Sequence, residues 1–96
     1  MALYYEVLIS YDIEENKNRK KLFDELKDMG LVSIQKSVFW GHLKGAEITI
    51  ISHLFDKYCS DNDKAFFVKA NLAKEILKNS FGYEKQDFEV KEFEYI

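Results

Sequence analysis

The sequence contains no proline and only four glycines among its 96 residues. It also has no Ser/Gly-rich tract and no repeat of recognisable period, features that are typical of linkers, tails and repeat arrays. A chain of this length buries roughly 65% of its unfolded surface, which is enough for one hydrophobic core. These absences predict a single ordered domain over residues 1–96.

Cysteine and histidine are equally scarce, with Cys59, His42 and His53 as the only examples. One cysteine cannot form an internal disulfide, and the three residues lack zinc-ligand spacing. Cys59 is predicted to be a buried apolar residue. Neither histidine has a Ser or Cys partner at a spacing typical of nucleophilic catalysis, so neither is expected to be functional.

Long hydrophobic runs are missing as well. No apolar stretch approaches the ~20 residues of a membrane-spanning helix, and the N-terminus lacks the basic region and cleavage site of a signal peptide. The sequence therefore predicts a cytoplasmic protein without a membrane partner.

The charges that are present are unevenly distributed. The net charge of −3 argues weakly against a nucleic-acid binder. Four cations nevertheless fall within five residues, namely Lys17, Arg19, Lys20 and Lys21, while residues 84–94 hold five acids and two lysines. A basic face and an acidic end are one interpretation, and a solvated helix face and an ordinary polar strand are the other.

Residues 5–13 (YEVLISYDI) run from an apolar stretch into Asp12 and then into a polar segment. The stretch is short and rich in aliphatic residues, which predicts a buried strand that ends near Asp12. A carboxylate fixed by a strand and open to a loop suits a metal ligand or a general base. The alternative is that Asp12 caps the helix that follows.

Helical periodicity follows this strand. Apolar residues at helical spacing predict a helix over residues 16–29, with Asn16 as its N-cap and Gly30 beyond its C-terminus. The four cations then lie in the first turns, where the helix dipole disfavours positive charge. An anionic group is expected to compensate them.

The remaining elements alternate between strands and helices. Residues 31–43 are rich in β-formers and predict a hairpin with its turn near Lys36 and Ser37, with a bulge at Gly41 as the alternative. A second helix is predicted after Gly45, a buried strand over 65–70, and a short helix that ends at Gly82. Alternation at Phe88 and beyond predicts a final strand within residues 83–96.

This order predicts an α+β, ferredoxin-like βαββαβ fold with an added C-terminal strand. Two helices would cover one face of the sheet and leave the other open. Because the sequence is rich in aromatic residues, an open face would expose a large apolar patch, and we expect a homodimer to cover it. An RNA-stacking platform is the competing interpretation, but the basic residues cluster on the first helix rather than on strands.

Several blocks of the sequence resemble the small CRISPR-associated endoribonuclease family, whose members are the smaller of the two core subunits that insert new spacers into CRISPR arrays. The resemblance spans nearly the whole chain. It rests on Tyr11-Asp12-Ile13, Arg19, Gly30, Gln35, Ser37-Val38-Phe39 and Asp63 before the segment 65–70.

The resemblance implies a homodimer in which the C-terminal strand of one subunit, within residues 83–96, adds to the sheet of its partner. It matches Tyr11 and Asp12 with the active-site pair of the family. The two Asp12 side chains would face each other and hold a divalent metal, magnesium or else manganese, since carboxylates and waters suit such ions.

The implied function is that of a CRISPR adaptation subunit that bridges integrase dimers and binds the backbone of duplex DNA. The alternative is a metal-dependent endonuclease that cleaves single-stranded RNA or double-stranded DNA with Asp12 as its metal ligand; a toxin-like RNA nuclease is a third candidate. Lys21 and Ser33 stand where family members often have Arg, and both bind phosphate less firmly. The expected nucleic-acid contacts are Lys17, Arg19, Lys20, Lys21, Ser37 and Phe39.

Overall fold

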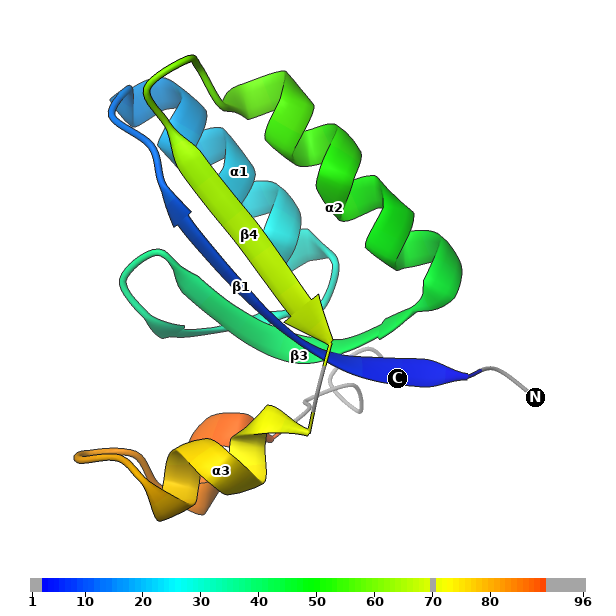
Figure 1. Cartoon of the computed structure of the whole chain (residues 1–96), viewed down its shortest axis with the longest axis vertical. Helices are drawn as coiled ribbons and strands as arrows, with labels where there is room; N and C mark the ends of the chain where they lie inside the picture. The colour runs from blue at the N-terminus through cyan, green and yellow to red at the C-terminus, as the bar shows by residue number, and fades with distance from the viewer. Residues whose placement is uncertain (1–2, 70, 90–96) are drawn as a thin grey trace.

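A computed structural model describes residues 3–69 and 71–89, and its first six elements follow the predicted βαββαβ order (Figure 1). The ferredoxin-like α+β fold is therefore confirmed. The elements are β1 (Tyr4–Asp12), α1 (Asn16–Asp28), β2 (Val32–Gln35), β3 (Val38–Lys44), α2 (Gly45–Tyr58), β4 (Lys64–Lys69), α3 (Leu72–Lys78) and the 3-10 helix η1 (Lys85–Phe88).

The four strands form one antiparallel sheet in the order β2-β3-β1-β4. β1 lies inside the sheet, where Ile9 pairs with Phe39 of β3 on one side and with Phe67 of β4 on the other. A strand that is hydrogen-bonded along both edges has little freedom to move. β1 therefore gives Asp12, its last residue, a rigid support.

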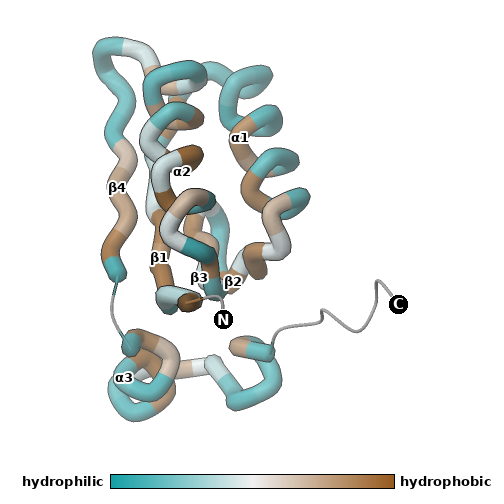
Figure 2. The backbone as a smooth tube through the Cα atoms, turned by 90° about the vertical axis from the view of Figure 1, so that its right-hand side faces the viewer, coloured by the Kyte–Doolittle hydropathy of each residue, from teal (hydrophilic) through white to brown (hydrophobic). Residues whose placement is uncertain are grey.

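The main core lies between the sheet and the helices α1 and α2, which cover the same face (Figure 2). Alternate residues of β1 point into this core because successive side chains of a strand leave on opposite faces. Its fully buried members include Val7 and Ile9 of β1, Leu22 and Leu26 of α1, and Ile51 of α2.

The N-terminus of α1 differs from the prediction. Glu15, not Asn16, is the N-cap, and its carboxylate accepts hydrogen bonds from the backbone nitrogens of Lys17 (2.9 Å) and Asn18 (2.8 Å). This carboxylate supplies the anionic group that the cations of the first turns require. The interpretation of Asp12 as a helix cap is therefore wrong. Gly30 has a φ of 88° beyond the helix, as predicted.

The hairpin turn between β2 and β3 lies at Lys36 and Ser37, as predicted. Gly41 is not a bulge, since it pairs regularly with Val7, and the irregularity of the hairpin lies between Ser33 and Gln35. A Cβ atom on Gly41 would lie 2.6 Å from Cδ2 of Leu31. Close packing against Leu31 therefore explains this glycine.

The C-terminal part of the chain departs most from the prediction. Helix α3 ends at Lys78 rather than at Gly82, and residues 85–88 form η1 instead of a strand. The predicted strand is therefore wrong as far as Phe88. Its remaining residues, 90–96, lie outside the described part of the chain.

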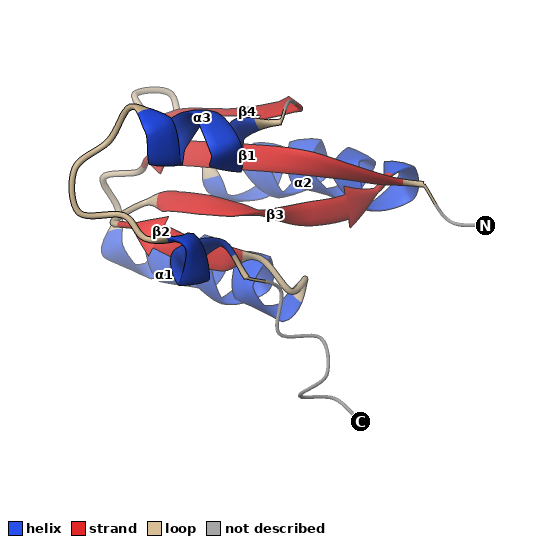
Figure 3. Ribbon diagram, turned by 90° about the horizontal axis from the view of Figure 1, so that it is seen from below, coloured by secondary structure: helices blue, strands red, loops and turns tan. Residues whose placement is uncertain are grey.

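The second face of the sheet is only half open. The C-terminal arm, as we call residues 71–89, places α3 and η1 on the side opposite to α1 and α2 (Figure 3). Trp40 is 2% exposed because Phe88 of η1 packs edge-on against it, with 5.2 Å between ring centroids. Phe66 and Val68 of β4 remain 53% and 40% exposed. The prediction of a wholly uncovered face is therefore wrong over β3 and holds over β4.

Candidate functional site

Asp12 ends β1 with its side chain exposed on the face away from the main core. Its sequence neighbours Tyr11 and Ile13 are buried, and strand alternation sends Asp12 to the other face. Lys64, the first residue of β4, is its partner across the sheet. The only ion pair within residues 3–69 and 71–89 joins Lys20 and Asp24, so the Asp12 carboxylate has no such partner there.

Tyr11 points the opposite way. Its ring is 5% exposed and stacks on Phe39 in the core, with 6.4 Å between centroids. Burial raises the pKa of its hydroxyl, an effect reduced by a hydrogen bond with the Ser37 side chain and by the charge of Arg19. The structure thus places the side chains of Tyr11 and Asp12 on opposite faces of β1. The active-site role expected of Tyr11 stays a prediction.

Ser37 and Phe39 support the same end of β1 from the hairpin. The Ser37 carbonyl accepts a hydrogen bond from the Tyr11 backbone nitrogen at 3.1 Å, and Ser37 has a φ of 60°. Phe39 is fully buried, with Phe23 edge-on to it at 5.2 Å. Phe39 therefore supports the core, and Ser37 fastens the hairpin to β1. The nucleic-acid contacts expected of both residues stay predictions.

Arg19 is turned toward its own loop rather than toward solvent. Its Nη1 donates to the Ile13 carbonyl at 2.8 Å, with the Glu14 carbonyl 3.5 Å away, and its Nη2 donates to the Asn16 side chain. The side chain is half-buried. A phosphate would have to compete for these donors, so Arg19 holds the loop in this conformation.

The three lysines of the basic run are exposed on α1. Lys17 and Lys21 stand four residues apart and hence on one side of the helix. Lys20 pairs with Asp24 at 3.0 Å, but both side chains are well exposed and such a pair contributes little. Together with the exposed Lys64 of β4, these lysines are accessible cations at the Asp12 end of the molecule.

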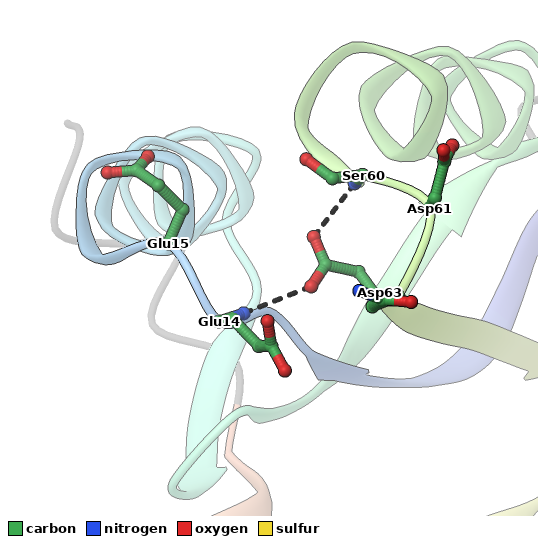
Figure 4. A pocket seen from close by; sticks show the side chains of 6 residues that line it. Glu14, Glu15, Ser60, Asp61 and Asp63 are labelled. Carbon is green, nitrogen blue, oxygen red and sulfur yellow. Dashed lines mark hydrogen bonds between the residues drawn. The ribbon is translucent and has the colours of Figure 1, made fainter.

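Asp63 is a structural residue that the sequence analysis did not assign. Its Oδ1 accepts a hydrogen bond from the Glu14 backbone nitrogen (3.0 Å) and its Oδ2 from that of Ser60 (2.8 Å; Figure 4). These two bonds lower the pKa of the carboxyl group. An Asp three residues after a Ser in a predicted turn was the available signal. A hollow of about 450 Å³ surrounds it, lined by Glu14, Glu15, Ser60, Asp61, Asn62 and Asp63.

The described residues of one chain do not form a complete metal centre. No group of three or more His, Cys, Asp or Glu side chains is arranged to hold a metal among the described residues. Magnesium, however, is commonly bound through one or two carboxylates, with waters and substrate phosphates completing its shell. The single exposed Asp12 therefore fits a magnesium ion only if a second copy or a phosphate supplies further ligands.

Comparisons with known proteins identify the family. Residues 5–79 match the family model described as CRISPR associated protein Cas2. The chain is 43% identical over 88 residues to the "CRISPR-associated endoribonuclease Cas2 1" of Francisella tularensis subsp. novicida, covering 92% of this chain and 91% of that protein. A shorter match, 47% identical over 38 residues, links it to the Cas2 endoribonuclease of Desulforudis audaxviator, covering 40% of this chain and 36% of that protein.

The fold agrees with a solved structure. A "Crystal structure of cas2" superposes with a TM-score of 0.62 at 21% sequence identity, covering 70% of this chain and 75% of that one. None of the helices described for residues 3–69 and 71–89 is long and apolar enough to cross a membrane. The extent of the sequence matches is decisive, and the chain belongs to the Cas2 family of CRISPR-associated proteins.

Proposed function

We propose that the protein acts as a homodimer that bridges two integrase dimers and holds duplex DNA by its phosphate backbone during spacer acquisition. The observation that carries this proposal is the set of exposed lysines at the start of α1, Lys17, Lys20 and Lys21. Lysine binds phosphate as a point charge on a flexible stem, which positions DNA without reading its sequence.

The dimer would form over the open half of the sheet. Phe66 and Val68 of β4 are exposed there, and the half-buried Leu8 of β1, which pairs with Val68, extends them into an apolar strip. Soluble monomers rarely leave large contiguous apolar patches exposed. Asp12 lies on the same face of β1, so a second copy seated on this strip would bring the two Asp12 carboxylates toward each other.

A metal-dependent endonuclease is the second candidate. The curated relatives carry the name endoribonuclease, and the exposed Asp12 at a rigid strand end suits a ligand role. Two facing carboxylates repel unless a cation or a proton lies between them. Magnesium or manganese bound there would act as a Lewis acid and activate a water against a phosphodiester of single-stranded RNA or double-stranded DNA.

The salt dependence of DNA binding tests the bridging proposal. Each phosphate contact contributes about −0.9 to the slope of log affinity against log salt. If both copies of Lys17 and Lys21 contact phosphates, the double variant Lys17→Ala/Lys21→Ala should flatten the slope by about 3.6. Lys74→Ala/Lys78→Ala, which removes two exposed lysines of α3, is the matched control and should leave the slope unchanged.

Spacer acquisition with the integrase separates the two candidates. We expect the Lys17/Lys21 variant to stop acquisition, whereas Asp12→Ala should retain it and lose only metal-dependent cleavage. Normal acquisition by the lysine variant together with failure of a dimeric Asp12→Ala protein would overturn the bridging proposal and favour the nuclease.

A further inference from the structure

The short loop of residues 13–15 joins Asp12 to the basic helix and is held from two sides. From α1, the Arg19 guanidinium donates to the Ile13 carbonyl at 2.8 Å. From the connection between α2 and β4, the Asp63 carboxylate accepts from the Glu14 backbone nitrogen at 3.0 Å. The loop is therefore fixed by one cation and one anion that come from different parts of the fold.

Asp63 is well suited to hold this loop because its own position is fixed. Its second oxygen accepts from the Ser60 backbone nitrogen at 2.8 Å, and its backbone nitrogen donates to the Ser60 carbonyl at 2.9 Å. One carboxylate thus links Ser60 to Glu14 (Figure 4). Hydrogen bonds to an ionised acceptor are among the stronger ones in proteins.

Residues next to Asp63 and Glu14 connect this hydrogen bond to Asp12. Lys64 follows Asp63 directly and pairs with Asp12 across the sheet. Glu14, the residue that Asp63 holds, lies two positions after Asp12. The backbone is thus restrained beside Asp12 and immediately after it, and a metal ligand works only when its supports fix it to within about 0.5 Å.

We propose that Asp63 is a positioning residue of the Asp12 site: by holding the 13–15 loop it sets where the Asp12 carboxylate stands when it binds a divalent cation. This inference rests on the part of the proposed function that makes Asp12 a metal ligand. Asp63 itself does not contact the cation. Partners that hydrogen-bond a metal ligand directly typically change metal affinity by about 10–100-fold when they are removed. Asp63 acts through the backbone of Glu14, so its effect should fall at the lower end of that range.

The test uses the full-length protein and Mn²⁺ as the probe. Binding is measured by electron paramagnetic resonance titration, and amide hydrogen exchange at Glu14 is followed by NMR, with circular dichroism as the check of folding. Asp63→Ala removes both acceptor oxygens, and Asp63→Asn keeps one. Asp61→Ala is the matched control, because Asp61 lies in the same turn, is exposed and makes no side-chain hydrogen bond with the described residues.

We expect Asp63→Ala to speed exchange at Glu14 and to weaken Mn²⁺ binding by about 10-fold or more. Asp63→Asn should show partial rescue of both quantities, and Asp61→Ala should match the wild-type protein. Such a graded effect on Mn²⁺ affinity is expected if Asp63 acts by positioning the loop. If Asp63 only stabilised the fold, the two variants, as long as they are folded, would bind Mn²⁺ equally well.

Three distinct results would overturn the inference. Wild-type Mn²⁺ affinity in Asp63→Ala, with faster exchange at Glu14 and with Asp12→Ala unable to bind, would show that Asp63 is only structural while Asp12 remains the ligand. Wild-type affinity in Asp12→Ala would show that Asp12 is not the ligand, so the proposed metal assignment itself fails. If Asp63→Ala does not fold, an unchanged affinity in Asp63→Asn with faster Glu14 exchange overturns the inference.

Discussion

The two halves of β1 anchor different segments of the chain, and they do so by different means. Around Asp12 the strand end is fastened by several short links, which run from Asp63 to Glu14, from Arg19 to Ile13 and from Tyr11 to Ser37. Each of these links joins a backbone group, so each fixes the path of the chain.

The other half of β1 carries the attachment of the C-terminal arm, which depends on one carboxylate. Oε2 of Glu6 accepts hydrogen bonds from Trp40 Nε1 (2.6 Å) and from the backbone nitrogens of Leu72 (2.9 Å) and Ala73 (2.6 Å). This group therefore holds the start of α3 on the sheet. Helix α3 itself has no buried residue, and Phe81 after it is 99% exposed.

The two regions differ in how strongly they are attached to the main core. The Asp12 end belongs to the main core, because Tyr11 and Phe39 join its links to the buried cluster. The C-terminal arm makes few contacts with the sheet: Phe88 packs on Trp40, and Tyr83 packs on Phe88 and donates a hydrogen bond to β2. Regions with few buried contacts open locally with a lower free energy than the whole domain. We therefore expect the arm to leave the sheet without unfolding the core.

The largest expected effect comes from the same substitution made in both regions. Phe39→Ala should lower the free energy of unfolding by about 3–5 kcal/mol, the usual cost of removing a fully buried ring. Phe88→Ala should cost far less globally, because Phe88 packs only where the arm meets the sheet. Urea unfolding followed by circular dichroism measures both. Equal losses would show that the arm is part of the cooperative core.

The fold of the first six elements could be predicted because each has a strong local pattern. Val7 and Ile9 alternate with half-buried residues on β1, and Leu22 and Leu26 recur at helical spacing on α1. The arm could not be predicted in this way. Alternation at Phe88 is equally satisfied by a 3-10 turn whose ring is buried on Trp40, and the sequence does not reveal that distant contact.

In the candidate site, too, local features could be predicted from the sequence and distant contacts could not. The exposure of Asp12 followed from its place at a strand end, and strand alternation already implied that Tyr11 points the opposite way. The roles of Arg19 and Asp63 needed the structure. Asp63 holds a backbone group 49 positions away. Its only local signal, a Ser three residues earlier, does not reveal that distant partner.

An intermediate effect is expected at the anchor of the arm. Glu6→Ala leaves the Trp40 indole and the first nitrogens of α3 without their acceptor, which should weaken attachment of the arm by about 1–3 kcal/mol. Trp40 is the only tryptophan in the chain, so its emission should shift to longer wavelength as the arm leaves.

Glu47→Ala is the matched control for Glu6. The Glu47 carboxylate also accepts from a backbone nitrogen at a helix start, that of Lys44 at 2.8 Å, but it serves α2. This variant should leave the Trp40 emission unchanged. An unshifted emission in Glu6→Ala would mean that the aromatic contacts alone keep the arm in place, and the contrast between the two regions would be lost.

The smallest expected effect is on the pH dependence of stability, and it tests the links at the Asp12 end. Hydrogen bonds from the Ser60 and Glu14 backbone nitrogens lower the pKa of Asp63 below its ordinary 3.8. A carboxyl group with a lower pKa in the folded state contributes stability that is present above its unfolded value and is lost as pH falls through the folded one. Asp63→Asn should therefore be less stable than wild type at neutral pH, and the difference should shrink below about pH 4. Urea midpoints measured across this range for wild type, Asp63→Asn and the turn control Asp61→Asn give the three acid profiles. A wild-type profile in Asp63→Asn would mean that the link to Glu14 does not stabilise the folded state. If instead the stabilities of Asp63→Asn and wild type converge at low pH and the Trp40 emission does not shift, the lost stability belongs to the Asp12 end rather than to the arm.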